Sequence, residues 1–143
     1  RNNCKKRGVN FFVANDKKLL SKLNADGLYI SAHNANLLLN SFSKSKYKII
    51  GAAHNQKEVD IKIKQGCKTI IYSRLFRTGY DYKKGYLGVI KFNIISHRLK
   101  LNLVPLGGIN EKNLCKLNSV VSNSFACLSA IKKKPAKIIN RLF

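Results

Sequence analysis

Residues 101–110 read Leu-Asn-Leu-Val-Pro-Leu-Gly-Gly-Ile-Asn, an apolar run that ends in two glycines and a potential helix cap. This pattern predicts a buried strand over Leu101–Leu106 and a helix that begins at Asn110. Two glycines between a strand and a helix can turn backbone N–H groups toward an anion. The stretch therefore predicts a phosphate-binding turn at Gly107 and Gly108, although a tight turn without a ligand needs the same residues.

Short apolar runs of this kind recur along the chain and alternate with longer amphipathic stretches. We expect helices to begin at Asp16, Asn55 and Asn110, a fourth helix over Leu87–His97 and a last one over Pro135–Phe143. The predicted strands, besides Leu101–Leu106, are Asn10–Ala14, Gly27–Ile30, Tyr47–Gly51, Thr69–Tyr72 and Ser124–Leu128.

Alternating strands and helices predict an α/β fold with a parallel sheet. A repeat of roughly two dozen residues suits a (β/α)8 barrel or an open doubly wound sheet. No Gly-x-Gly-x-x-Gly pattern follows the first predicted strand, which disfavours a dinucleotide-binding protein. The length of 143 residues fits a single domain over 1–143.

The formal net charge of +22 suggests a nucleic-acid partner, but the basic residues are spread over nearly every predicted helix. We therefore expect small-molecule phosphate ligands, no nucleic acid and no membrane, since no apolar run approaches the ~20 residues of a membrane span. The cysteine spacing fits neither zinc ligands nor a disulfide framework, which predicts reduced thiols and a cytoplasmic location. The chain begins at Arg1 and contains no Met, so we expect residues upstream of it.

Polar side chains follow the predicted strands, where parallel α/β folds place their reactive groups. Asn15 and Asp16 could hold a hydrated Mg²⁺ and a phosphate oxygen, or Asp16 could be only a helix cap. His54 could act as a general base or bind an anion, or be structural. The long loop 73–85 carries Arg74, Arg77 and Thr78, and loops of this length are often phosphate clamps.

Taken in order, these motifs resemble thiamine phosphate synthase and the thiazole tautomerase of the same superfamily. The resemblance covers about Phe11 to Ile131. It is carried by an apolar strand ending in Asn-Asp, an Ala-Asp-Gly motif, a Gly-x-x-His segment, an aromatic residue two places before Thr, and two phosphate turns. In this chain these are Phe12–Asp16, Ala25–Ile30, Ile50–His54, Phe76–Thr78, Leu106–Asn110 and Ala126–Ile131.

The resemblance implies a (β/α)8 TIM barrel that lacks about its first two βα units. It also implies a reaction in which hydroxymethylpyrimidine diphosphate loses pyrophosphate and is captured by a thiazole phosphate. The implied roles are catalysis by His54 and Thr78, binding of pyrophosphate by Asn15 and Thr78, binding of Mg²⁺ by Asp16, and binding of the thiazole phosphate by Gly107, Gly108, Leu128 and Ser129.

The chain also departs from the family pattern. Asn34 stands where the family has a second metal-binding Asp, and Ala52 stands where it has Ser. The family's Lys after Thr has no clean counterpart, so Lys83 or Lys84 would have to replace it. These departures leave three alternatives open: a synthase, a tautomerase that uses His54, and a non-catalytic phosphate-binding relative. An open sheet edge would also allow a homo-oligomer.

Overall fold

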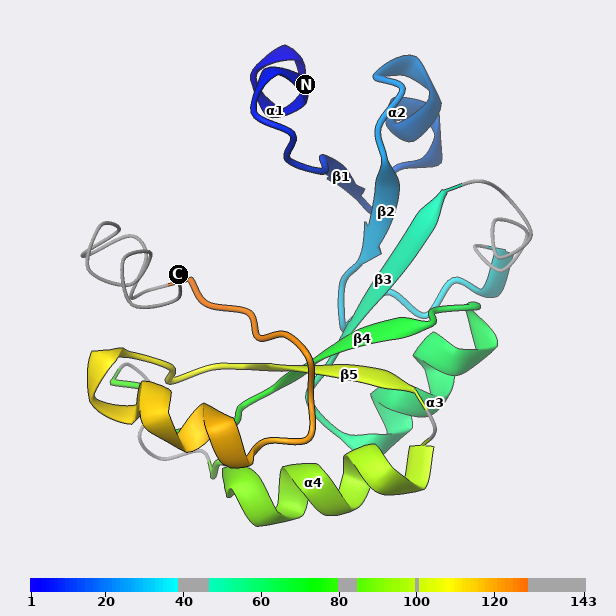
Figure 1. Ribbon diagram of the computed structural model, residues 1–143. Helices are drawn as coiled ribbons and strands as arrows, with labels where there is room; N and C mark the ends of the chain where they lie inside the picture. Colours follow the sequence, from blue (N-terminus) through cyan, green and yellow to red (C-terminus); the bar gives the residue numbers. More distant parts are fainter. Residues whose placement is uncertain (39–46, 80–84, 100, 129–143) are drawn as a thin grey trace. The chain divides into compact units, whose positions relative to one another are not determined.

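The computed structural model describes residues 1–38, 47–79, 85–99 and 101–128. Its strands follow one another in the sheet in chain order, β1-β2-β3-β4-β5 (Figure 1), and the pairs β1–β2 and β2–β3 are parallel. An open doubly wound sheet reverses its strand order, whereas a barrel keeps it. The predicted α/β class is confirmed and the barrel type is favoured. The strands are β1 (Phe12–Ala14), β2 (Gly27–Ile30), β3 (Lys48–Ala53), β4 (Thr69–Ser73) and β5 (Asn102–Leu106).

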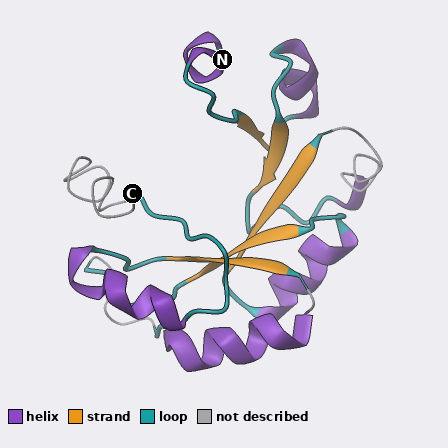
Figure 2. Cartoon of the chain, viewed as in Figure 1, coloured by secondary structure: helices purple, strands orange, loops and turns teal. Residues whose placement is uncertain are grey.

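Among the described residues, a helix separates each strand from the next except between β2 and β3 (Figure 2), and three predicted caps are confirmed. Asp16 accepts a hydrogen bond from the Leu19 N–H, Asn55 from the Glu58 N–H, and Asn110 forms a capping box with Asn113. The predicted helix over Pro135–Phe143 lies outside the described residues. The helices are α1 (Asn2–Lys6), α2 (Lys17–Lys22), α3 (Gln56–Lys64), α4 (Gly88–Leu99) and the 3₁₀ helix η2 (Glu111–Ser119).

One prediction of secondary structure is wrong. The predicted strand Ser124–Leu128 is reduced to one parallel bridge, in which Ala126 pairs with Leu106. The Ser122 hydroxyl donates to the Leu103 carbonyl at 2.7 Å and so takes an acceptor that a continuing strand would use.

The contacts group the chain into two compact units, Arg1–Ile70 and Ile71–Phe143. In the first unit, α2 packs on β1 and β2, and α3 packs on β3. Leu20 from α2 and Val59 from α3 are fully buried there, whereas Leu19 remains 39% exposed.

The Ala-Asp-Gly motif has a structural role in the first unit. The Asp26 carboxylate accepts a hydrogen bond from the Phe11 N–H at 2.7 Å and forms an ion pair with the Arg1 guanidinium at 3.5 Å. A Cβ on Gly27 would collide with the Lys48 carbonyl oxygen and the Phe12 ring. The motif is therefore explained by the pairing of β1, β2 and β3 without reference to a ligand.

In the second unit, α4 packs against β5 and η2. Phe92 from α4, Leu75 and Leu103 are almost completely buried in its core.

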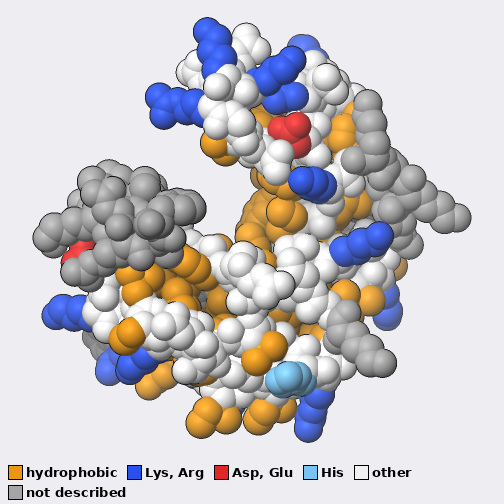
Figure 3. Space-filling model, in the orientation of Figure 1, with side chains coloured by type: hydrophobic (Ala, Val, Ile, Leu, Met, Phe, Trp, Pro, Cys, Tyr) orange, Lys and Arg blue, Asp and Glu red, His pale blue; other side chains and the backbone are white. Residues whose placement is uncertain are grey.

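Figure 3 shows Lys and Arg side chains scattered over the visible face instead of forming one stripe. None of the four cysteines is in a disulfide, and burial raises the pKa of the Cys67 thiol to about 11. No helix within the described residues is long and apolar enough to cross a bilayer.

Candidate functional site

The Gly107–Gly108 turn closes on the segment that follows β4. Both glycines have positive φ, +100° and +71°. A Cβ on Gly108 would lie 2.5 Å from the carbonyl oxygens of Phe76 and Arg77, and a Cβ on Gly107 would lie 3.2 Å from the Arg74 Cα. Other residues would therefore strain the backbone and push this segment away.

The hydrogen bonds of the turn leave its N–H groups available. The Gly107 carbonyl accepts from the Phe76 N–H at 3.0 Å, and the Gly108 carbonyl accepts from the side chains of Asn110 and Asn113 at 2.9 and 2.8 Å. Within the described part of the chain, no acceptor is paired with the N–H of Gly107 or Gly108. The carbonyls thus bind protein while two adjacent donors remain for an anion.

A guanidinium group lies beside this turn. Arg74 follows β4, its Cγ would be 3.2 Å from a Cβ on Gly107, and its Nη1 donates to the Thr78 Oγ1 at 3.2 Å. Thr78 is 7% exposed, so its hydroxyl is held inside the unit. Glu111 follows the glycine turn in sequence, and its Oε1 is buried with no hydrogen-bond partner among the described residues.

Sequence reasoning placed Arg74 in a phosphate-clamp loop without assigning it a role. The available signal was its position directly after a strand, which is where parallel α/β folds present side chains to ligands. The structure adds its contacts with Thr78 and with the glycine turn. Arg74 therefore belongs with the candidate phosphate ligands of the second unit.

The second predicted phosphate turn is only partly described. The Ala126 N–H donates to the Pro105 carbonyl at 2.9 Å, and the Cys127 Sγ lies 3.6 Å from the Ile109 carbonyl oxygen. These contacts bring the chain before Leu128 alongside the glycine turn, and Leu128 itself is 61% exposed. Ser129, and also Lys83 and Lys84, lie outside the described residues.

In the first unit, Asn15 and Asn34 bind each other. The Asn15 Oδ1 accepts from the Asn34 Nδ2 and from the Ser31 N–H, both at 3.0 Å, and the Asn15 Nδ2 donates to the Ser31 Oγ at 3.1 Å. The Asn34 Oδ1 accepts from the Asn36 N–H at 3.0 Å. Asn15 adopts φ +57°, a left-handed conformation that asparagine tolerates. We call this set of Asn15, Ser31 and Asn34 the amide cluster.

The amide cluster does not fit a magnesium site built from two carboxylates. Mg²⁺ prefers charged oxygen ligands, and Asp16 is the one carboxylate here. Its Oδ1 accepts from the Leu19 N–H at 2.8 Å, so the cap interpretation of Asp16 is confirmed. The oxygens of Asn15 and Asn34 already accept hydrogen bonds from protein. The described residues contain no group of three His, Cys, Asp or Glu side chains that could hold a metal.

His54 is paired with a carboxylate on α3. The Glu58 Oε2 accepts from the His54 backbone N–H at 2.7 Å and lies 3.1 Å from the ring Nδ1, while its Oε1 accepts from Asn55. Burial raises the pKa of Glu58, but the bonds from His54 and Asn55 outweigh burial and leave that pKa below its usual value. His54 also stacks on His33, with ring centroids 6.1 Å apart. The imidazole is thus oriented and half exposed.

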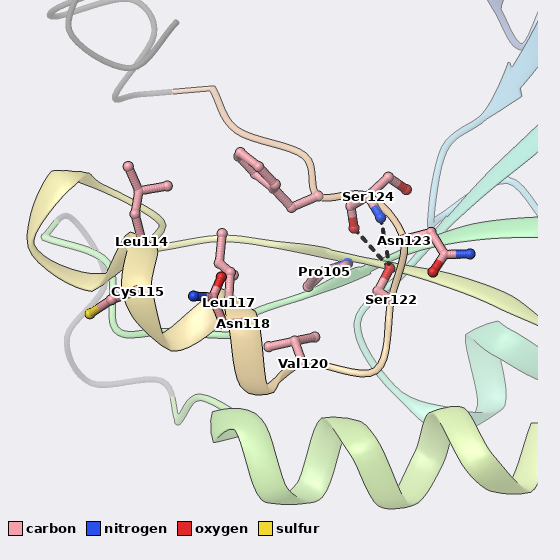
Figure 4. A pocket seen from close by; sticks show the side chains of 10 residues that line it. Pro105, Leu114, Cys115, Leu117, Asn118, Val120, Ser122, Asn123 and Ser124 are labelled. Atoms are coloured by element: carbon pink, nitrogen blue, oxygen red, sulfur yellow. Dashed lines mark hydrogen bonds between the residues drawn. The ribbon is translucent and has the colours of Figure 1, made fainter. Parts of the chain in front are cut away.

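The second unit also contains a cavity of about 360 Å³ (Figure 4). Leu114 and Leu117 of η2 both line it. The cavity lies between η2 and the segment after it and does not include Arg74, Thr78 or the glycine turn. Its lining residues are Pro105, Leu114, Cys115, Leu117, Asn118, Val120, Ser122, Asn123, Ser124 and Phe125.

Comparison with known protein families gives a match over most of the chain. The sequence model of the thiamine monophosphate synthase family matches residues 1–131. The chain belongs to this family. The predicted resemblance is therefore confirmed.

Individual relatives agree with this membership. The chain is 26% identical over 129 residues to a thiamine-phosphate synthase of Prochlorococcus marinus, covering 90% of this chain and 37% of the relative. It is 29% identical over 145 residues to a thiamine-phosphate synthase of Pelagibacter ubique, covering 97% and 70%. The chain thus spans little more than a third of the Prochlorococcus protein.

A solved structure supports the fold. The chain matches the thiamine phosphate pyrophosphorylase of Pyrococcus furiosus with a TM-score of 0.71 at 16% identity, covering 98% of this chain and 72% of that one. A similarity at this identity concerns the fold alone. The thiamine monophosphate synthase family fold is therefore present in both proteins.

Proposed function

We propose that this member of the thiamine monophosphate synthase family takes part in thiamine biosynthesis, joining hydroxymethylpyrimidine diphosphate to thiazole phosphate. The observation that carries the proposal is the Gly107–Gly108 turn, with two N–H donors from which no described residue accepts and the Arg74 guanidinium beside them. Such donors suit a phosphate monoester, because they supply directed hydrogen bonds and a positive charge. We further expect a cytoplasmic protein with small-molecule phosphate ligands.

The proposed reaction exchanges one bond for another at the pyrimidine methylene carbon. The C–O bond to the diphosphate breaks, and pyrophosphate leaves with the electron pair. The thiazole ring nitrogen then donates its lone pair to the methylene carbon and forms the new C–N bond. The protein contributes mainly by positioning and by stabilising charge.

Within the second unit, the role of each group follows from its position. The Gly107 and Gly108 N–H groups would bind the thiazole phosphate, and Arg74 would neutralise part of its charge. Thr78 fixes the guanidinium through a hydrogen bond of 3.2 Å, so it would act by orienting Arg74. In the first unit, the amide cluster would contact the diphosphate of the other substrate.

The direct test is turnover with both substrates. We expect thiamine phosphate to form only when both are present and Arg74→Gln to reduce binding of thiazole phosphate measured by calorimetry. Failure of the unaltered protein to bind thiazole phosphate would contradict the proposal. Binding without any product would instead favour a non-catalytic phosphate-binding relative.

A tautomerase is the second candidate, favoured by the pairing of His54 with Glu58 at 3.1 Å. A carboxylate beside one ring nitrogen orients the imidazole and leaves the other nitrogen to exchange a proton with a substrate. This reaction uses no diphosphate, so the neutral Asn34 would not weaken it. We expect His54→Gln to abolish proton exchange in a thiazole carboxylate phosphate while leaving synthase turnover nearly unchanged; the reverse outcome would eliminate this candidate.

A further inference from the structure

Helix α3 contains a lysine that is completely buried. The Lys62 side chain is 0% exposed, and its Nζ donates to the Asn34 carbonyl oxygen at 2.7 Å and to the Gln65 Oε1 at 3.0 Å. Its stem packs beneath β3, where a Cβ on Gly51 would lie 2.9 Å from the Lys62 Cδ. The absence of a side chain at Gly51 therefore leaves the space in which the Lys62 stem packs.

The ammonium group has no ion-pair partner among the described residues, whose salt bridges join Arg1 to Asp26 and His54 to Glu58. The neighbouring Cys67 supplies no negative charge, since burial raises its pKa to about 11. Burial lowers the pKa of Lys62 itself, which is the expected cost of an unpaired buried cation. An apolar side chain of similar length would pack at a lower cost, so packing alone does not explain Lys62.

Lys62 and Gln65 together hold the segment after β2. The Gln65 Nε2 donates to the carbonyl oxygens of Asn34 at 2.9 Å and of Asn36 at 3.1 Å, and Lys62 donates to the first of these. The same segment presents the Asn34 amide to Asn15. A continuous chain of contacts thus runs from the buried ammonium group to the amide cluster at the carboxyl ends of β1 and β2.

We propose that Lys62 is the positioning residue of a diphosphate subsite at the amide cluster, where it fixes Asn34 and supplies a buried positive charge. The proposal deepens the proposed function and rests on it. Asn34 stands where the family pattern has a metal-binding carboxylate, so this chain presents an uncharged amide backed by a cation. A buried charge is weakly screened, and it attracts an anion more strongly than an exposed lysine does.

Binding of inorganic pyrophosphate, measured by calorimetry in the absence of Mg²⁺, tests the charge. We compare Lys62→Met, which removes the charge and the donors, with Lys62→Gln, which keeps a donor. Lys64→Met is the matched control, because Lys64 is exposed on the same helix. We expect affinity to fall about tenfold or more in Lys62→Met, less in Lys62→Gln and under about twofold in Lys64→Met.

Amide hydrogen exchange tests the positioning without any ligand. We expect Lys62→Met to accelerate exchange at Asn34 and Asn36 while the amides of β2 and β3 stay protected, and Lys62→Gln to restore part of the protection. Equal pyrophosphate affinity in Lys62→Met and the unaltered protein, or unchanged exchange at both residues, would overturn the proposal. If the unaltered protein binds thiazole phosphate but not pyrophosphate, the diphosphate subsite is wrong while the thiazole phosphate site of the second unit stands.

Discussion

The strand ends of the two units offer an anion different groups. In the first unit, the amide oxygens of Asn15 and Asn34 accept from protein groups, and each amide nitrogen uses one of its two N–H donors within the cluster. In the second unit, the donors at Gly107 and Gly108 belong to the backbone, and no described residue accepts from them. The comparison teaches that a polar residue type at a strand end does not establish that its hydrogen-bonding groups are available.

The two regions should therefore respond differently to substitution. The turn of the second unit depends on backbone conformation and on the close approach of residues 74–77. The amide cluster of the first unit depends on side-chain hydrogen bonds. A change of shape should damage the turn most, whereas a change of charge should alter the cluster most.

The largest effect is expected from Gly108→Ala. The new Cβ would lie 2.5 Å from the carbonyl oxygens of Phe76 and Arg77, at a residue with φ +71°. We expect a loss of roughly 2–4 kcal/mol in the free energy of unfolding, measured by urea denaturation, together with loss of thiazole phosphate binding. Gly79→Ala is the control, because no atom of a described residue lies within 4 Å of its added Cβ.

Equal stability of Gly108→Ala and Gly79→Ala would show that the turn tolerates a side chain, and the comparison between the units would fail. Gly108→Asp should also abolish phosphate binding. The structure gives this variant two causes, because the side chain would displace the segment after β4 and add a negative charge. Gly108→Ala separates the first cause from the second.

The next largest effect is expected from Arg74→Gln. The substitution removes the charge beside the glycine turn but leaves the backbone donors in place. We expect affinity for thiazole phosphate to fall roughly tenfold or more by calorimetry, with a small change in stability. Arg98→Gln changes an exposed arginine of the same unit and should leave the affinity unaltered. Equal affinities in the two variants would exclude Arg74 as a phosphate ligand.

Asn34→Asp should convert the amide cluster toward a metal site. The new carboxylate would replace the donor that now binds the Asn15 Oδ1 at 3.0 Å, so we expect a loss of about 1 kcal/mol in stability without metal. It would also place a carboxylate in the segment that follows β2, in addition to Asp16 after β1, and Mg²⁺ should then recover part of that loss. A variant whose melting temperature is insensitive to Mg²⁺ would contradict this prediction.

The smallest effect is expected from Glu58→Gln. Because the pKa of Glu58 is below its usual 4.5, its carboxylate stabilises the fold fully above about pH 4.5, and this stabilisation is lost as the pH falls through the lowered value. We expect a difference of about 0.5 kcal/mol between the two proteins near neutral pH, shrinking in acid. Thermal unfolding at several pH values measures it, and a pH-independent difference would contradict the pairing with His54.

Local patterns predicted much of the fold. The alternation of apolar runs gave the strand β2 at its observed bounds and the other strands within a few residues, and the caps at Asp16, Asn55 and Asn110 are confirmed. The predicted strand Ser124–Leu128 failed because the Ser122 hydroxyl, which lies before that run, binds the Leu103 carbonyl. Apolar periodicity contains no information about such a competing donor.

Site prediction was less complete, because it also depends on contacts between segments that a local pattern does not show. The glycine pair could be found because its backbone requirements are local, and the structure brings Thr78 and Arg74 to it. Lys62 could not be found, since a lysine on an amphipathic helix is normally exposed. Its burial depends on Gly51 and on the carbonyl of Asn34, which are distant in sequence.

The sequence by itself determined the parallel α/β class, the family and the glycine turn, because periodicity, caps and positive φ are properties of neighbouring residues. The tertiary structure decided which polar groups remain available: the Asn15 Oδ1 accepts from the Asn34 amide, Arg74 is fixed by Thr78, and Lys62 is buried. Hydrogen bonding and burial depend on contacts between segments far apart in the chain. These contacts exist only after the strands and helices have packed.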